Sequence, residues 1–201
     1  THYAGEGTVR SAKVCYNGEE VDLCLCRTKA HFSEEKDADG KVTRILTLDP
    51  VDIEFDGLTV KLQTKEYFEE GSGNIRIERT ILEMSDPTAK VEINEYMVAC
   101  YGTTEYPEDM TGITLKASKG NTAESINYEY KCREAAVMGA EEVSAVIPAI
   151  ETKVSMTASS EDAEGYIREG YAFSPMFTLG YKKTMSDKEV FATWLNLEKA
   201  N

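Results

Sequence analysis

Few residues of this chain could support chemistry that needs an imidazole group. Its 201 residues include only two histidines, His2 and His31. Imidazole titrates near neutral pH and is a common zinc ligand. Neither histidine stands in a context typical of a catalytic triad, and no G-x-S-x-G turn for a nucleophilic serine is present. The sequence therefore predicts no serine- or cysteine-based nucleophilic enzyme.

Carboxylates are the abundant alternative, since the chain has 36 aspartates and glutamates. A glycosidase uses two carboxyl groups roughly 5–10 Å apart, one of them with a raised pKa. The linear sequence does not give this spacing, so we interpret these carboxylates as a solvated surface and keep a carboxylate-pair enzyme as an alternative. The residues considered for such a pair are Glu78, Glu95, Glu105, Glu108 and Asp109.

One loop concentrates side chains that could bind a sugar. Residues 101–109 contain two tyrosines, three carboxylates and two threonines between strand segments. Tyrosine rings stack on apolar faces, and carboxylates accept hydrogen bonds from hydroxyl groups. The competing interpretation is a loop folded over one end of a sandwich with its tyrosines packed inward. The candidate ligand-binding residues are Tyr101, Thr104, Glu105, Tyr106, Glu108 and Asp109.

The sequence predicts no metal site and no cofactor. Residues 37–40, which read Asp-Ala-Asp-Gly, resemble the beginning of a calcium-binding loop. No third oxygen ligand and no closing glutamate follow at the required spacing. We therefore expect an ordinary turn at this position.

The net charge of -14 limits the expected partners. Nucleic-acid binding needs clustered lysines and arginines, and anionic membrane surfaces repel an acidic protein. No run approaches the roughly 18 apolar residues that a membrane-spanning helix needs. We expect a soluble protein that binds neither nucleic acid nor membranes.

The cysteines indicate a reducing environment. Their number is odd, and no CxxC pair is present, which argues against a complete disulfide framework. We expect Cys24 and Cys26 to share one face of a strand over residues 21–27 and to fill the core. Reduced thiols favour the cytoplasm or another reducing compartment, or a virion if the protein is structural. The five cysteines are Cys15, Cys24, Cys26, Cys100 and Cys132.

The elements that position these residues are mostly strands. Asn17-Gly18 predicts a hairpin turn between strands at 8–16 and 21–27. A break in the apolar alternation indicates a β-bulge near residues 94–95. Residues 33–41 are expected to form a charged loop, and residues 134–145 are the best helix candidate. Further strands are expected at 42–48, 51–55, 58–68, 75–81, 91–98, 113–117, 126–132, 150–158, 166–168, 176–183 and 190–197.

This spacing of strands predicts an all-β fold, an antiparallel β-sandwich with at most one or two short helices, and a single domain over residues 1–201. Residues 75, 77, 79 and 81 are expected to share one face of their strand, with Arg76, Glu78 and Thr80 on the other. The C-terminal aromatic residues fall in alternating strands, where core or interface packing is the default. They are Tyr166, Tyr171, Phe173, Phe177, Tyr181, Phe191 and Trp194.

Three segments carry a family resemblance. Residues 73–81, then Met84-Ser85-Asp86-Pro87, then residues 91–95 are similar to a strand–N-x-S-D-x-P–strand pattern. That pattern occurs in galactose-mutarotase-like supersandwich domains, which include the N-terminal domains of disaccharide phosphorylases and related glycosidases. Residues 170–175 also resemble the end of such domains. The catalytic histidines of true mutarotases have no match here, and those domains usually exceed 201 residues. The resemblance therefore implies carbohydrate association without epimerase activity.

These observations lead to one functional hypothesis and one main alternative, besides the carboxylate-pair enzyme. The hypothesis is a non-catalytic carbohydrate-associated β-sandwich, an accessory subunit or domain of a sugar-processing system. The alternative is a self-assembling structural protein, such as a phage tail-tube or virion component, which acidity, strand content and free cysteines also fit. The expected partners are a carbohydrate or another protein, with a homo-oligomer as a further expectation.

Overall fold

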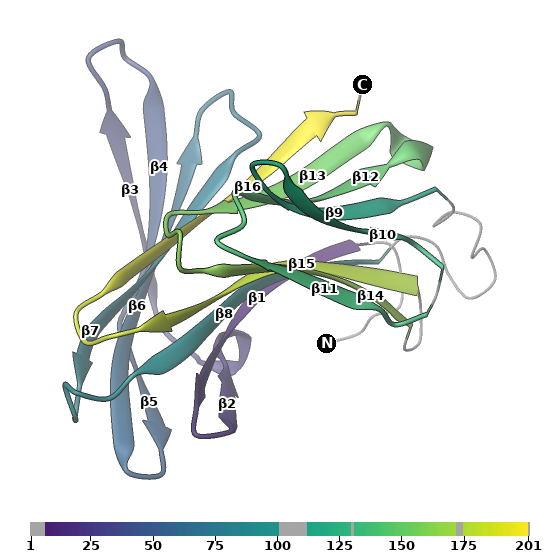
Figure 1. The fold of residues 1–201 in the computed structure, drawn as a ribbon. Helices are drawn as coiled ribbons and strands as arrows, with labels where there is room; N and C mark the ends of the chain where they lie inside the picture. Colours follow the sequence, from purple (N-terminus) through teal and green to yellow (C-terminus); the bar gives the residue numbers. More distant parts are fainter. Residues whose placement is uncertain (1–6, 101–111, 130, 172–174, 201) are drawn as a thin grey trace. The chain divides into compact units, whose positions relative to one another are not determined.

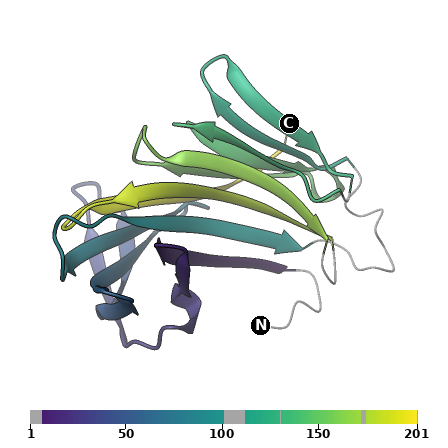
Figure 2. The ribbon, with the colours of Figure 1, turned by 60° about the horizontal axis from the view of Figure 1, so that its bottom comes forward.

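The protein is built almost entirely from strands. A computed structural model describes residues 7–100, 112–129, 131–171 and 175–200. Figures 1 and 2 show long strands joined by turns, and these strands form one antiparallel sheet of six strands and one of ten. The predicted all-β antiparallel sandwich is therefore confirmed. Within the described residues, two short 3-10 helices are assigned, η1 (Leu23–Leu25) and η3 (Pro148–Ile150).

The strands cover most of the described chain. In chain order they are β1 (Gly7–Tyr16), β2 (Glu19–Asp22), β3 (Ala30–Lys36), β4 (Val42–Leu48), β5 (Val51–Phe55), β6 (Leu58–Glu69), β7 (Ile75–Met84), β8 (Val91–Cys100), β9 (Thr114–Lys119), β10 (Thr122–Asn127), β11 (Glu134–Met138), β12 (Glu142–Ile147), β13 (Thr152–Ala158), β14 (Glu164–Tyr171), β15 (Pro175–Met185) and β16 (Val190–Lys199).

The chain divides into two compact units. Unit 1 comprises Thr1–Ser11, Glu95–Lys182 and Leu197–Asn201, and unit 2 comprises Ala12–Asn94 and Lys183–Asn196. The long strands β1, β8, β15 and β16 contribute residues to both units. The expectation of a single domain over residues 1–201 stays a prediction.

Unit 2 begins with the predicted hairpin. Asn17 and Gly18 adopt φ values of 48° and 85°, and Tyr16 pairs with Glu19 across the turn. Positive φ at both positions is the geometry of a type I′ turn, which matches the right-handed twist of the flanking strands. In the ten-stranded sheet, the strands of this unit have the order β16-β7-β6-β4-β3, with β5 paired to β6. The core side chains of this unit include Val14, Ile53, Leu62, Ile77, Ile81, Ile93 and Phe191.

Unit 1 contains the strand runs β10-β9-β12-β13 and β11-β14-β15. Tyr181 is fully enclosed, and its hydroxyl lies 3.2 Å from the carbonyl oxygens of Ala140 and Met156. The predicted core packing of the C-terminal aromatic residues is confirmed for Tyr166, Phe177 and Tyr181 in this unit, and for Phe191 in unit 2. Phe173 and the side chain of Tyr171 lie outside the described part of the chain.

The expected helix over residues 134–145 is wrong. Residues 134–138 form β11, which pairs with β14, and residues 142–147 form β12, which pairs with both β9 and β13. Gly139 between them has φ of 69°, outside the helical region. Val143 and Ala145 are both buried, in the two-residue period of a strand, so tertiary pairing overrides the helical preference of alanine and glutamate.

The expected strand over residues 21–27 is also wrong beyond Asp22. The chain turns into η1 there, because the Asp22 side chain accepts a hydrogen bond from the Cys24 backbone N–H at 3.0 Å. Cys24 is exposed and Cys26 is half-buried, so neither fills the core as expected. Among the cysteines whose side chains are described, Cys15, Cys24, Cys26 and Cys132 form no disulfide.

Two further expectations are corrected. Residues 33–36 belong to β3, and only residues 37–41 form the turn, since every residue of β3 pairs with β4. In β8, burial alternates without interruption from Val91 to Ala99. The break in the apolar pattern near residues 94–95 therefore reflects a buried glutamate, Glu95, and not a bulge that exchanges the two faces.

Candidate functional site

The predicted sugar-binding loop, residues 101–109, lies outside the described residues, so Tyr101, Thr104, Glu105, Tyr106, Glu108 and Asp109 stay predictions. The structure describes the residues that flank it. Strand β8 ends at Cys100 before the loop, and the Ile113 carbonyl after the loop accepts a hydrogen bond from the Tyr128 backbone N–H at 2.9 Å. Tyr128 directly precedes a cluster of charged side chains in unit 1.

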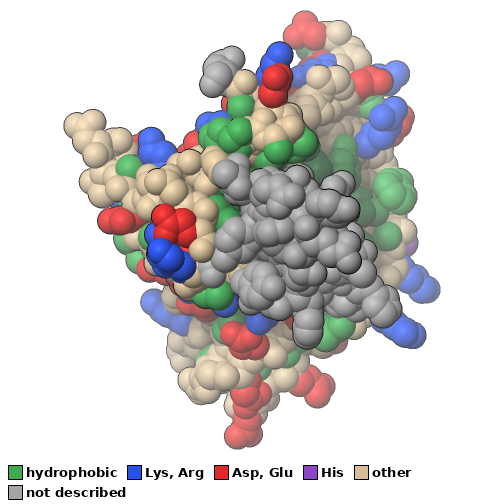
Figure 3. Space-filling model, turned by 90° about the vertical axis from the view of Figure 1, so that its right-hand side faces the viewer, with side chains coloured by type: hydrophobic (Ala, Val, Ile, Leu, Met, Phe, Trp, Pro, Cys, Tyr) green, Lys and Arg blue, Asp and Glu red, His purple; other side chains and the backbone are tan. Residues whose placement is uncertain are grey.

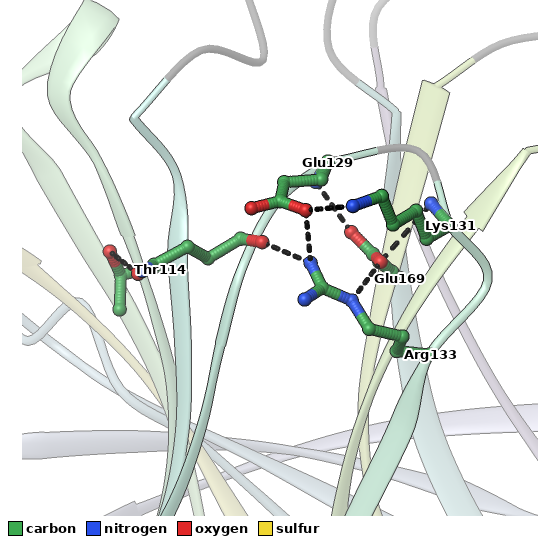
Figure 4. Close-up of polar contacts among 6 residues, drawn as sticks. Thr114, Glu129, Lys131, Arg133 and Glu169 are labelled. Atoms are coloured by element: carbon green, nitrogen blue, oxygen red, sulfur yellow. Dashed lines mark hydrogen bonds and ion pairs between the residues drawn. The ribbon is translucent and has the colours of Figure 1, made fainter.

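That cluster, the Glu169 cluster, consists of Glu129, Lys131, Arg133 and Glu169 (Figure 4). The Glu169 side chain on β14 is fully enclosed. Its carboxylate accepts hydrogen bonds from Arg133 Nε at 2.6 Å and from the backbone N–H groups of Glu129 at 2.7 Å and Lys131 at 3.1 Å. One carboxylate therefore fixes the segment that precedes β11 to strand β14.

The outer part of the Glu169 cluster is exposed to solvent. Lys131 Nζ donates to Glu129 Oε2 at 2.6 Å, and Arg133 Nη2 lies 3.7 Å from the same oxygen and donates to the Asn127 carbonyl at 2.5 Å. Because these side chains are 40 to 64% exposed, water weakens their ion pairs. Of the groups in this cluster, the enclosed Glu169 carboxylate therefore contributes most to the stability of the fold.

The charge state of Glu169 follows from this geometry. Burial of the carboxyl group opposes its ionisation, but the hydrogen bonds from Arg133, Glu129 and Lys131 outweigh burial and lower the pKa of Glu169. The hydrogen bond from Lys131 likewise lowers the pKa of Glu129. A general acid needs the opposite shift, so this cluster has the properties of a structural clamp and not of a proton donor.

The lowered pKa of Glu169 predicts a pH dependence of stability. Because the folded pKa lies below the unfolded value of about 4.3, the stabilisation is complete above that value and is lost as the pH falls through the folded pKa. We expect the stability difference between the wild type and Glu169→Gln, measured by urea denaturation, to shrink as the pH falls from about 7 to about 3. A difference that stays constant over this range would contradict the assigned charge state.

The other carboxylates considered as a catalytic pair have local partners. Glu95 in unit 1 is fully enclosed and lies 3.2 Å from Arg10 Nη2. Glu78 in unit 2 accepts a hydrogen bond from the Tyr67 hydroxyl at 2.5 Å. Asp37 forms the predicted ordinary turn, since its Oδ1 accepts from the backbone N–H groups of Asp39 and Lys41 at 2.9 Å each. Among the described residues, no group of three acidic, histidine or cysteine side chains could hold a metal ion.

A second candidate site lies on one sheet face of unit 2. We call it the Arg76 surface and define it by Tyr67 on β6, Arg76 and Glu78 on β7, and Trp194 on β16. Tyr67 and Trp194 are the direct cross-strand neighbours of Arg76 on its two sides. The next residue of β7, Ile77, is buried on the opposite face, so strand alternation aims these four side chains away from the core.

The guanidinium of Arg76 lies between two aromatic rings. Its Cζ is 4.7 Å from the centroid of the Tyr67 ring and 5.8 Å from that of Trp194, both within cation–π range. Arg76 also forms an ion pair with Glu78. Burial, together with the hydrogen bond to Glu78, raises the pKa of Tyr67 to about 12. The four side chains thus form one connected, half-exposed patch whose Arg and Glu charges compensate each other.

Elsewhere the surface carries mixed charge. On the face drawn in Figure 3, acidic and basic side chains are interspersed over the described residues. No helix among the described residues is long and apolar enough to cross a membrane.

Comparison with known proteins identifies the fold. No protein-family model and no curated protein matches the chain. The Slr1438 protein from Synechocystis sp. PCC 6803 has a TM-score of 0.56 at 8% identity, covering 93% of this chain and 73% of that one. The galactose mutarotase related enzyme from Lactobacillus acidophilus has a TM-score of 0.55 at 9% identity, covering 94% and 79%.

A larger enzyme contains a similar fold. The alpha-N-acetylgalactosaminidase NagBb from Bifidobacterium bifidum, solved as a GalNAc complex, has a TM-score of 0.59 at 9% identity. The match covers 96% of this chain but only 31% of that enzyme. At such identities the likeness concerns the fold alone, and at that level the resemblance to galactose-mutarotase-like proteins is confirmed.

The sequence signals for the two sites differ. The expectation that Arg76 and Glu78 share the face opposite Ile77 and Ile81 is confirmed. Trp194, which was expected to pack in the core or at an interface, is half-buried beside Arg76. This neighbourhood was missed because its strand, β16, comes from the far end of the chain. The Glu169 cluster was missed because two of its donors, Glu129 and Lys131, lie within residues 126–132, which the sequence assigns to a strand. In the structure β10 ends at Asn127, so that expected strand is wrong beyond this residue.

Proposed function

We propose that the protein is a non-catalytic carbohydrate-binding β-sandwich and that a neutral saccharide binds at the Arg76 surface. The observation that carries this proposal is the placement of Arg76 between the rings of Tyr67 and Trp194, with Glu78 beside it. Sugars present apolar C–H faces to aromatic rings and hydroxyl groups to charged donors and acceptors. Because Arg76 and Glu78 compensate each other's charge, the patch suits an uncharged sugar better than an acidic one.

The non-catalytic part of the proposal is supported by the state of the described carboxylates. Glu169 is enclosed, accepts three hydrogen bonds and has a lowered pKa. Such a group neither donates a proton near neutral pH nor reaches a substrate. Glu78 in the Arg76 surface is held by Tyr67 and Arg76. Its proposed role is to orient the guanidinium and accept a sugar hydroxyl.

The fold neighbours support an accessory role. The larger enzyme that shares this fold acts on a sugar derivative, and its similar region makes up 31% of its length. A sandwich of this kind in a sugar-processing protein can hold the saccharide while a separate catalytic part carries out the reaction. We therefore include a catalytic partner, either another domain or another subunit, in the proposal.

Trp194→Ala tests the site. We expect this substitution to weaken saccharide affinity about tenfold or more, because it removes one of the two rings of the patch. Isothermal titration calorimetry with galactose, N-acetylgalactosamine and neutral disaccharides measures the change. The matched control is Leu25→Ala, which removes an exposed apolar side chain of η1 in the same unit and should leave the affinity unchanged.

The predicted loop is a second location for the same function, and Tyr106→Ala separates the two. If Trp194→Ala abolishes binding and Tyr106→Ala does not, the saccharide binds at the Arg76 surface. The opposite result would move the site to residues 101–109. If the wild type binds no saccharide in a glycan array, carbohydrate binding is contradicted at both places.

A further inference from the structure

We propose that two copies of this chain associate through the outer edge of strand β3, which forms an antiparallel pair with β3 of the second copy centred on Phe32. This inference concerns assembly and does not depend on saccharide binding.

Strand β3 is an edge strand with unusual exposure. It pairs with β4, and its other edge has no partner strand in the described ranges of the chain (Figure 1). All seven of its side chains are exposed, and Phe32 is 78% exposed. An open edge presents unpaired backbone N–H and C=O groups to any strand of matching register. A large exposed aromatic side chain at the middle of such an edge adds apolar surface to an association.

Backbone hydrogen bonds show which groups are available on this edge. The Asp49 N–H donates to the Lys29 carbonyl at 2.9 Å, and the Asp37 N–H donates to the Lys41 carbonyl at 3.1 Å. These bonds mark odd-numbered residues as those that bond to β4. Because bonded and non-bonded positions alternate in an antiparallel pair, the even-numbered residues direct their N–H and C=O groups outward. They are Ala30, Phe32, Glu34 and Lys36.

Among the two-fold axes that pass through an outward-bonding residue, side chains favour one register. A two-fold axis at Phe32 places Phe32 opposite Phe32 of the second copy, which brings apolar surface together. The same register places Lys29 opposite Glu35 of the second copy, twice by symmetry, so the charges are complementary. A two-fold axis at Glu34 would instead oppose two glutamates. No like charges are directly opposed in the register centred on Phe32.

This geometry also defines the size of the assembly. The contact is isologous, since both copies contribute the same edge. Once two copies have paired, neither has an open β3 edge to bind a third copy. It therefore gives a closed dimer and not an open tube.

Phe32→Pro tests the edge. Proline at position 32 removes an N–H group that points away from β4, so the β3–β4 pairing keeps its hydrogen bonds. The proposed contact between copies loses two hydrogen bonds, one from each copy. We expect sedimentation velocity over a concentration series to show a reversible dimer for the wild type and a monomer for this variant. A wild type that stays monomeric up to the highest soluble concentration, or a variant that dimerises like the wild type, would overturn the proposal.

A charge exchange tests the register. Lys29→Glu alone should raise the dimer dissociation constant about tenfold, because it opposes two glutamates at both symmetric positions. The double variant Lys29→Glu/Glu35→Lys restores opposite charges and should restore dimerisation. If the double variant is as weak as the single one, the register is wrong. Circular dichroism of each variant confirms that the monomer is folded.

Discussion

Replacing Glu169 with alanine is expected to lower the free energy of unfolding by about 3 kcal/mol. The substitution leaves Arg133 Nε and the backbone N–H groups of Glu129 and Lys131 without their common acceptor. The carboxylate is fully enclosed, so its removal takes the acceptor from the enclosed part of the cluster, although Arg133, which is 40% exposed, still reaches water. Urea denaturation followed by circular dichroism at neutral pH measures the loss.

The control for Glu169 is its neighbour in the same cluster. Glu129→Ala removes a carboxylate that is 48% exposed, so we expect a much smaller loss of stability than for Glu169→Ala, because water screens surface ion pairs. Equal losses for the two variants would show that the enclosed carboxylate is not the centre of this clamp.

Gly165→Ala is expected to destabilise the protein by about 2–3 kcal/mol through steric overlap in the core of unit 1. A Cβ atom at this position would lie 2.6 Å from Ala140 Cβ and 2.9 Å from both Tyr181 Cε1 and Val143 Cγ1. Tyr181 is fixed by its enclosed hydroxyl, so the ring cannot move aside without weakening those polar contacts. Thermal denaturation should show a clearly lowered midpoint.

Gly170→Ala on the same strand is the matched control. Its Cβ would meet the flexible Met176 side chain at 3.3 Å, so we expect a loss below about 1 kcal/mol. If Gly165→Ala proves as mild as Gly170→Ala, the packing around Tyr181 is looser than the distances indicate.

The local parts of the fold could be predicted from sequence, and the long-range parts could not. The Asn17-Gly18 turn and the alternation in β7 depend on neighbouring residues, and both are confirmed. Glu95 interrupts the apolar pattern of β8 because it is a charged residue at a buried position. Its partner, Arg10, lies 85 positions earlier in the chain. A pattern of residue types does not show that a glutamate will be enclosed with such a distant cation.

The same limit applies to the candidate sites. Strand alternation places Arg76 and Glu78 on one face, but only the pairing of β7 with β16 brings Trp194 to them. Residues 134–145 have helical composition, and only the neighbours β9 and β13 make residues 142–147 a strand. A site formed by residues on paired strands can therefore be identified only once the order of the strands in the sheet is known.

The most direct test of the proposed function uses the only tryptophan of the chain. Because Trp194 lies in the Arg76 surface, its fluorescence reports on that site. We predict that titration with a neutral saccharide that the protein binds will change the emission of Trp194 saturably, with the same dissociation constant as calorimetry gives. Saccharide binding that leaves the emission unchanged would place the site elsewhere, and a chain that binds no saccharide would contradict the proposed function.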